Sequence, residues 1–386
     1  MKAFFSAVWE YIKNTDKIFW LLTLSATVYG AILIASVQRT TEYNYLSTQI
    51  IAATLGYIGA IILSVMDYKT VAKMWWAVGG VAMFLTILVF FVGIQVEGTD
   101  DKAWLRLPGG FTFQPSELTK ICFIITLAYH LSYLAEKGKL KKFTSLLGLM
   151  LHVAVPAILI HFQGDDGAAL IFLIMFVVIT FLAGVALRYY FVLLLAVGCA
   201  APIVWTYLLN DDHRGRILAL FDIDGNASNP FVWQQYQGKI SIATGQLDGK
   251  GLFNGPRVDS EIVPYQENDF IFSVAGEELG FIGCLLLLAI LFLIMIRAIM
   301  VASKSEDALG KFLCYGFFAL IMVQTCLNIG MVLGFLPVIG VTLPFFSAGG
   351  TSAMCLYFGV GLVQSVYMHR NDPDKLNFRV DHYPTL

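Results

Sequence analysis

The sequence contains few charged residues and no paired cysteines. Only 13% of its 386 residues are charged, about half the share of a soluble domain, while 58% are apolar. All six cysteines lie in apolar runs and none forms a Cys-x-x-Cys pair, which argues against a disulfide framework or a zinc site. No internal repeat and no inverted pair of broken helices of the transporter kind is present. The composition predicts an all-α polytopic membrane protein.

Ten apolar runs are long enough to cross a bilayer, which takes about 20 residues each. They fall near 19–38, 48–66, 74–95, 116–135, 143–161, 167–187, 190–209, 270–297, 312–336 and 345–368. We therefore expect a single transmembrane domain over 1–386 with about ten helices. A large extracellular loop, 210–268, would separate helices 7 and 8. An aromatic and basic segment, 1–17, suits an interfacial helix, and 369–386 would form a cytoplasmic tail.

Lysine and arginine are distributed unevenly among the short loops. With the N-terminus inside, the inner segments carry 16 of them and the short outer loops carry three, Arg39, Lys102 and Arg106. Because cytoplasmic loops are enriched in these residues, the sequence predicts that both termini are cytoplasmic and that the loop 210–268 is outside.

The outer loop 210–268 is acidic, with eight Asp and Glu against five Lys and Arg. Bulk charge would therefore not attract polyanions, and we expect no nucleic-acid partner. Any phosphate handled here needs a few placed cations or a bound metal. Residues 231–244 predict an amphipathic helix, and the glycine-rich stretch 245–255 fits no phosphate-binding fingerprint, so a turn-rich loop is the favoured interpretation.

Asp269 lies at the seam between this loop and the eighth apolar run. A carboxylate at a membrane boundary loses part of its water, which raises its pKa and suits it to proton transfer. The alternative interpretation is a helix cap made by Asn268 or Asp269. Glu277 and Glu278 follow two turns further in, where carboxylates are costly; a structural role at the start of the helix competes with a functional one.

Two other acidic positions stand near spans. Glu117 and Lys120 are spaced i, i+3 at the start of the fourth run, so they can pair; they indicate either a polar cavity or an interfacial ion pair. Asp165 and Asp166 occupy a very short outer turn and either face the same cavity or are simply solvated. Asp269, Glu117 and Asp165 together would supply the hard oxygen ligands that Mg²⁺ or Mn²⁺ prefers.

The last third of the chain is interrupted by proline and glycine. Pro344, Ser347, Gly349 and Gly350 break an apolar run. Irregular backbone at membrane depth is tolerated where it lines a cavity or is buried in protein, whereas small residues also serve tight helix contacts. Both interpretations stay open.

These features together resemble the SEDS family of RodA, FtsW and SpoVE type over nearly the whole chain. The most specific matches are Phe113-Gln-Pro-Ser-Glu117 with Lys120, Pro264 followed by Asp269-Phe-Ile-Phe272, Gly276-Glu-Glu-Leu-Gly280, and Pro344 with Ser347 and Gly349-Gly350. Lesser matches are Arg214 with Arg216, Gln237, and Leu247-x-Gly-Lys-Gly251. The Gly-Lys-Gly stretch is more similar to the RodA branch than to FtsW.

The resemblance implies a peptidoglycan glycosyltransferase that polymerises lipid II at the outer face of the bacterial cytoplasmic membrane, in cell elongation and shape, with a class B penicillin-binding protein as partner. Asp269 matches the family's essential aspartate and is expected as general base, with undecaprenyl pyrophosphate leaving. Glu117, Lys120 and Asp165 match its polar cavity residues and are expected to bind substrate.

Cations are expected to neutralise the leaving pyrophosphate. The candidates are Arg214, Arg216, Lys239 and a divalent cation, Mg²⁺ or Mn²⁺. The chain departs from the family at Glu267, where a histidine is usual, which places a second carboxylate near Asp269 and is expected to raise one pKa or help to hold a metal. A lipid II flippase and a non-catalytic scaffold that activates the penicillin-binding protein are the alternative functions.

Overall fold

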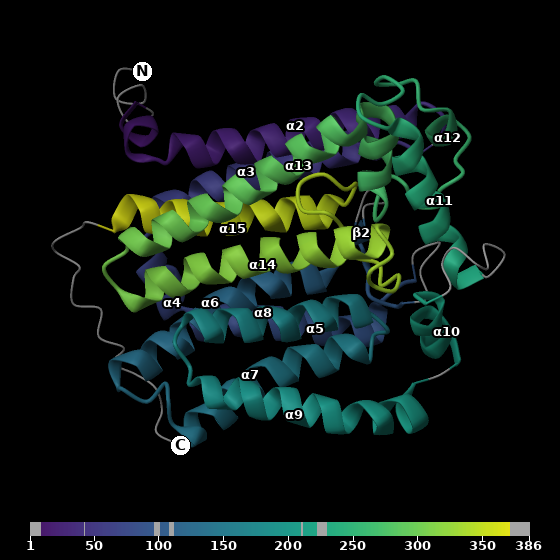
Figure 1. Cartoon of the computed structure of the whole chain (residues 1–386). Coiled ribbons are helices and arrows are strands. Elements are labelled where there is room, and N and C mark those ends of the chain that lie inside the picture. The colour runs from purple at the N-terminus through teal and green to yellow at the C-terminus, as the bar shows by residue number, and fades with distance from the viewer. Residues whose placement is uncertain are drawn as a thin grey trace.

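The structure is a computed structural model of the chain and describes residues 9–41, 43–95, 101–107, 112–209, 211–221 and 230–370. Long helices lie side by side in a bundle, and most of the shorter elements gather at one end of it (Figure 1). Within the described residues, nine helices are long and apolar enough to cross a membrane.

The long helices are α2 Lys17–Gln38, α3 Tyr45–Val65, α5 Trp75–Val92, α6 Pro115–Glu136, α7 Phe143–His161, α9 Leu187–Ile203 with its π-helical continuation Val204–Leu208, α13 Ile271–Lys304, α14 Ala308–Val332 and α15 Gly350–His369. A tenth apolar helix, α8 Asp166–Leu182, has 17 residues, the lower end of the spanning range. The prediction of an all-α membrane protein with about ten spans is confirmed. Consistent with an even number of crossings, α2 begins and α15 ends at the same end of the bundle (Figure 1).

Shorter elements make up the rest of the described chain. They are α4 Tyr68–Lys73, α10 Asp211–Ala219, α11 Pro230–Gly245, α12 Pro256–Asp259, and the strands β1 Leu105–Arg106 and β2 Thr112–Phe113, which pair antiparallel. Helix α11 confirms the helix predicted over 231–244, although apolar and polar residues are not separated onto two faces as the prediction of an amphipathic helix requires. Most of the predicted interfacial and tail segments, residues 1–8 and 371–386, lie outside the described residues.

Several helices begin at a side chain that accepts a hydrogen bond from the first turn. Asp16 accepts from the N–H of Phe19 at 3.2 Å, and Asp307 accepts from the N–H of Gly310 at 2.6 Å. Such caps satisfy N–H groups that have no partner inside the helix. Helix α6 instead starts with Pro115, which lacks the N–H that would be unsatisfied there.

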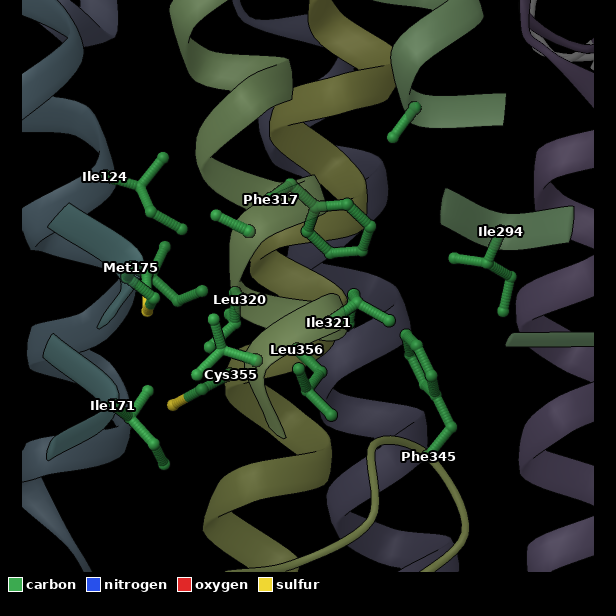
Figure 2. Packing of buried hydrophobic residues seen from close by; sticks show 14 of the residues in the cluster. Ile124, Ile171, Met175, Ile294, Phe317, Leu320, Ile321, Phe345, Cys355 and Leu356 are labelled. Atoms are coloured by element: carbon green, nitrogen blue, oxygen red, sulfur yellow. The ribbon is translucent and has the colours of Figure 1, made fainter. Parts of the chain in front are cut away.

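The most buried spans, α6, α14 and α15, form the centre of the bundle. Figure 2 shows Ile124 of α6, Leu320 of α14 and Leu356 of α15 in one apolar cluster. Small residues allow close helix contacts, as membrane interfaces require. A Cβ at Gly316 would lie 2.4 Å from Cγ2 of Ile124, and one at Gly56 would lie 2.8 Å from Cα of Met354.

The glycine-rich segment after α11 packs against a kink in α13. The kink lies at Gly280, whose φ is 65°. Next to it, the N–H of Gly251 donates to the carbonyl of Glu278 at 2.9 Å. A Cβ on Gly249, where φ is 80°, would lie 2.1 Å from the same oxygen, so glycine is required there. The glycines of 245–255 thus serve backbone packing, and the predicted turn-rich loop is confirmed.

Glu277 and Glu278 are fully buried at this junction. Oε1 of Glu277 accepts from the N–H of Arg257 at 2.7 Å, and Oε1 of Glu278 accepts from Oγ of Ser36 at 2.5 Å. Glu277 therefore fastens the loop 210–268 to α13, and Glu278 fastens α13 to α2, which favours the structural interpretation of both.

The last predicted span begins later than expected. The apolar pattern predicts a start at 345, but α15 begins at Gly350 because residues 333–349, here called the irregular segment, are not helical. Phe345 is buried in this segment with a φ of 68°, and it lies near α15 in Figure 2. Within this segment, residues 343–348 are all buried, so this part is irregular backbone buried within protein, which is one of the two interpretations proposed.

Candidate active site

Asp269 lies directly before α13, at the seam that the sequence predicts. The N-cap of α13 is Phe270, whose side chain makes no capping hydrogen bond, so the helix-cap interpretation of Asn268 or Asp269 is wrong. The irregular segment borders the carboxyl group: a Cβ on Gly340 would lie 3.6 Å from Oδ2 of Asp269. The Asp269 side chain is thus available for a role other than capping.

Burial and acidic neighbours set the protonation of Asp269. Burial raises the pKa of its carboxyl most, and the charges of Glu267, Asp101 and Asp165 raise it further, to about 7. The expected effect of Glu267 is therefore confirmed in direction. Burial likewise raises the pKa of Glu267 itself.

Asp165 is the link between Asp269 and the fourth span. It caps α8 by accepting from the N–H of Ala168 at 2.9 Å, and its other oxygen accepts from Nε2 of Gln114 at 2.8 Å and from Oγ of Ser116 at 3.3 Å. Only 9% of the residue is exposed. Burial raises its pKa to about 6, with opposing smaller effects from the Ala168 bond and neighbouring charges.

The adjacent Asp166 behaves differently. Its side chain is 44% exposed and pairs with His161. The two interpretations of this short turn, a residue that faces the interior and a residue that is solvated, therefore each apply to one residue. Asp165 faces the protein interior, and Asp166 faces outward.

Glu117 and Lys120 form the predicted ion pair on α6. Nζ of Lys120 lies 2.8 Å from Oε1 of Glu117, and the side chains of Lys120 and Glu117 are 1% and 10% exposed, respectively. Such burial excludes a lipid-facing or solvated pair and favours the polar-interior interpretation. Both charges act on Asp165, and Asp165 acts on Asp269. The structure therefore gathers these four predicted residues into one electrostatic cluster.

The two arginines predicted as cations in the loop 210–268 donate to backbone carbonyls outside this cluster. Arg214 donates to the carbonyls of Trp205 and Thr206, at 2.9 and 3.0 Å, where α9 and its continuation end. Arg216 donates from Nη1 to the carbonyl of Val338 in the irregular segment at 3.2 Å. Lys239 is half-buried on α11.

Two charged residues near these elements escaped the sequence interpretation. Asp101 acts on both Asp165 and Asp269, yet it stands in a loop with no local pattern to mark it. Arg257 donates to two side chains of α11, to Oγ of Ser241 at 2.9 Å and to Oε1 of Gln237 at 2.5 Å. Because Arg257 donates to Gln237, the family match at Gln237 was the one feature of the sequence that could have drawn attention to Arg257.

The three carboxylates expected as metal ligands do not form a ready metal site. Among the described residues, no group of three or more His, Cys, Asp or Glu is placed to hold an ion. The oxygens of Asp165 already accept from three donors, and Glu117 is paired with Lys120. The donor set of Asp269, Glu117 and Asp165 therefore does not fit a metal in this arrangement, and a divalent cation stays a prediction.

An apolar cavity of about 640 Å³ lies away from the carboxylates, between α2 and α13. Leu24, Val28, Ile282 and Leu286 are among its lining residues. No residue of the electrostatic cluster lines it. The electrostatic cluster, by contrast, contains a carboxyl group with a pKa near neutrality, that of Asp269, and such a group is suited to accept a proton from a hydroxyl group.

Comparisons with known proteins agree with this architecture. The profile of the Cell cycle protein family, FtsW/RodA/SpoVE, matches residues 16–372. The Geobacter sulfurreducens protein named probable peptidoglycan glycosyltransferase FtsW is 31% identical over 363 residues, covering 92% of this chain and 95% of that one. The Escherichia coli peptidoglycan glycosyltransferase MrdB is 30% identical over 367 residues, covering 94% and 95%.

Solved structures show the same fold. A chain of a peptidoglycan synthase complex, described as coordinating polymerization and crosslinking, superposes with a TM-score of 0.78 at 26% identity, covering 93% of this chain and 99% of that one. The Thermus thermophilus rod shape determining protein RodA superposes with a TM-score of 0.68 at 25% identity, covering 92% and 98%. The chain belongs to the FtsW/RodA/SpoVE family of cell cycle proteins.

Proposed function

We propose that this chain is a peptidoglycan glycosyltransferase that polymerises lipid II at the outer face of the bacterial cytoplasmic membrane. The observation that carries the proposal is the carboxyl group of Asp269, whose pKa is raised to about 7 by burial and by its acidic neighbours. A general base is most effective when its pKa lies near the working pH. Family membership and the names of the FtsW and MrdB relatives support the reaction class.

In the proposed reaction, the carboxylate of Asp269 accepts the proton of a sugar hydroxyl of one lipid II molecule. The hydroxyl oxygen then forms a bond to the anomeric carbon of the second molecule. The bond from that carbon to the pyrophosphate breaks, and undecaprenyl pyrophosphate leaves with the electron pair. A single displacement of this kind inverts the anomeric centre.

Substrate binding is proposed for Glu117, Lys120 and Asp165, on the strength of their electrostatic link to Asp269. Arg216 and Lys239 are the preferred cations for the leaving pyrophosphate. Arg214 is less suited to this role because its guanidinium group is engaged with two backbone carbonyls.

The proposed cellular setting is the cytoplasmic membrane, with both termini cytoplasmic, as the loop charges predict. A class B penicillin-binding protein is the proposed partner, and the structural likeness to a chain of a peptidoglycan synthase complex supports it. We assign the chain to cell elongation on the RodA-like Gly-Lys-Gly stretch, although the FtsW and MrdB relatives match at nearly equal identity.

Polymerisation of lipid II by the purified protein with its penicillin-binding partner tests the proposal. Asp269→Asn keeps the size of the side chain but removes the base, and we expect the rate to fall by about 10²–10⁴-fold. Asp166→Asn, at an exposed carboxylate nearby, is the matched control and should retain activity. Full activity in Asp269→Asn would remove Asp269 as the base.

The buried Glu117–Lys120 pair is the observation that favours a lipid II flippase as second candidate, since charges inside a span often mark a transport path. A flip assay in liposomes without polymerisation separates the two functions. A transporter would lose flipping on replacement of Glu117 or Lys120 and tolerate Asp269→Asn. A scaffold would keep its cell-shape function in Asp269→Asn.

A further inference from the structure

Three consecutive backbone carbonyls, those of residues 267–269, each accept a hydrogen bond from α14 or the irregular segment. The N–H of Ala348 donates to the first at 2.8 Å, Oγ of Ser347 to the second at 2.6 Å, and Nδ2 of Asn328 to the third, the carbonyl of Asp269, at 2.7 Å. The backbone that carries the proposed base is therefore held at every residue by a part of the chain about 60 to 80 positions away.

Asn328 makes two of the contacts in this region with one amide group. Its Nδ2 donates both to the carbonyl of Asp269 and to the carbonyl of Val341, each at 2.7 Å. Because both partners are acceptors, the opposite orientation of the amide would place Oδ1 against two carbonyl oxygens, so the hydrogen-bond pattern fixes the orientation. Asn328 is fully buried, and its Oδ1 has no hydrogen-bond partner within the described structure.

We propose that Asn328 is a positioning residue, whose amide ties Asp269 to the irregular segment and thereby fixes the carboxylate where it meets the sugar hydroxyl. The inference rests on the proposed function. The same segment borders that carboxylate at Gly340, 3.6 Å from Oδ2 to the position of an added Cβ. A shift of the base by about 1 Å typically lowers the rate by about 100-fold. The hydrogen bonds from Asn328 to the carbonyls of Asp269 and Val341 should therefore affect the rate of the chemical step and not the binding of substrate.

Steady-state polymerisation with the partner protein tests this by separating kcat from KM. Asn328→Leu keeps the approximate size of the side chain and removes both donors. We expect kcat to fall by about 100-fold and KM to change by less than about threefold. Thr325→Val is the matched control on the same helix, because Oγ1 of Thr325 is buried without a partner in the described structure; its kcat should stay within about twofold of wild type.

A second variant covers the case in which Asn328→Leu does not fold. Oγ of Ser347 donates to the carbonyl of Asn268 and accepts from the N–H of Leu343, so Ser347→Ala loosens the same attachment. We expect its kcat to fall by about tenfold at nearly constant KM. An unchanged kcat in this variant would overturn the inference.

A double variant distinguishes positioning from general destabilisation. If Asn328 acts through Asp269, adding Asn328→Leu to Asp269→Asn should cost little further rate, because residues that act as a unit are not additive. Additive losses, or a wild-type kcat in Asn328→Leu, would overturn this inference alone. A wild-type protein that does not polymerise lipid II with its partner would overturn the proposed function, and this inference with it.

Discussion

The raised pKa of Asp269 predicts a specific response to replacement of Glu267. The proposed base, Asp269, can accept a proton only when it is deprotonated, so wild-type polymerisation should rise with pH and reach half of its plateau near pH 7, the pKa of Asp269. The charge of Glu267 is the largest contribution after burial. Glu267→Gln removes that charge while leaving an oxygen to accept the hydrogen bond from Tyr45.

The expected shift of the pH midpoint follows from the total rise in the pKa of Asp269. The pKa of Asp269 rises from 3.8 to about 7, burial contributes most, and three carboxylates share the remainder. Removing the largest of the three should therefore lower the midpoint by about one pH unit, equivalent to about 1.4 kcal/mol. At pH 6 the deprotonated fraction would then increase from about one tenth to about one half, so activity relative to the plateau should rise about fivefold.

The assay is lipid II polymerisation between pH 5 and 9, with each variant normalised to its own plateau. Glu261→Gln is the control, because Glu261 is an exposed carboxylate of the same loop that acts on Glu267 but is not among the charges that raise the pKa of Asp269. A Glu267→Gln midpoint that stays at about pH 7, or moves upward, would refute the electrostatic argument. So would the same midpoint in the residual activity of Asp269→Asn.

Three further predictions concern stability, measured as Tm in detergent. Asp269→Asn should raise Tm relative to wild type at pH 8 but not below about pH 4. A carboxyl whose pKa is raised on folding loses its contribution to stability as pH rises through about 7. The same difference in Tm between the variant and wild type at both pH values would contradict this. Lys120→Met should cost about 3–5 kcal/mol by leaving Glu117 buried without its partner, and adding Glu117→Gln should recover much of that loss. Gly249→Ala should lower Tm without raising KM for lipid II, whereas Gly198→Ala, in open space on α9, should not lower Tm.

Hydropathy predicted the spans well because a helix that crosses the apolar part of a bilayer must be apolar over its full length of about 20 residues. Hydropathy placed the start of the last span too early, at residue 345, because a segment buried within protein and a segment buried in lipid are both rich in apolar residues. Phe345 and Phe346 are apolar and buried, yet Phe345 has a φ of 68°, which is incompatible with a right-handed helix. The proline and glycine pattern indicated the break but could not place its boundaries.

The candidate residues could be chosen from the sequence, but most of their contacts could not be predicted from it. Glu117 and Lys120 pair within one helix turn, so local spacing was sufficient. Asp165 and Asp269 are separated by more than 100 residues, and only the packing of α6, α8 and α14 brings them into one electrostatic cluster. For Arg214 the sequence suggested a role that its contacts do not favour. Its charge and its family match suit a phosphate, but its guanidinium group donates to the backbone carbonyls of Trp205 and Thr206.

Backbone hydrogen bonds hold the proposed base, Asp269, in its position. A half-buried carboxylate with acidic neighbours is unfavourable when charged, so Asp269 would tend to rotate or move toward water if its backbone were free. Its carbonyl and those of the two preceding residues are instead held by Asn328, Ser347 and Ala348. These hydrogen bonds involve neutral groups and do not neutralise the carboxylate, so they fix its location without lowering the pKa that makes it a base at neutral pH. Position and basicity of Asp269 are therefore controlled by different parts of the chain, and variants of Asn328 and Glu267 should separate them.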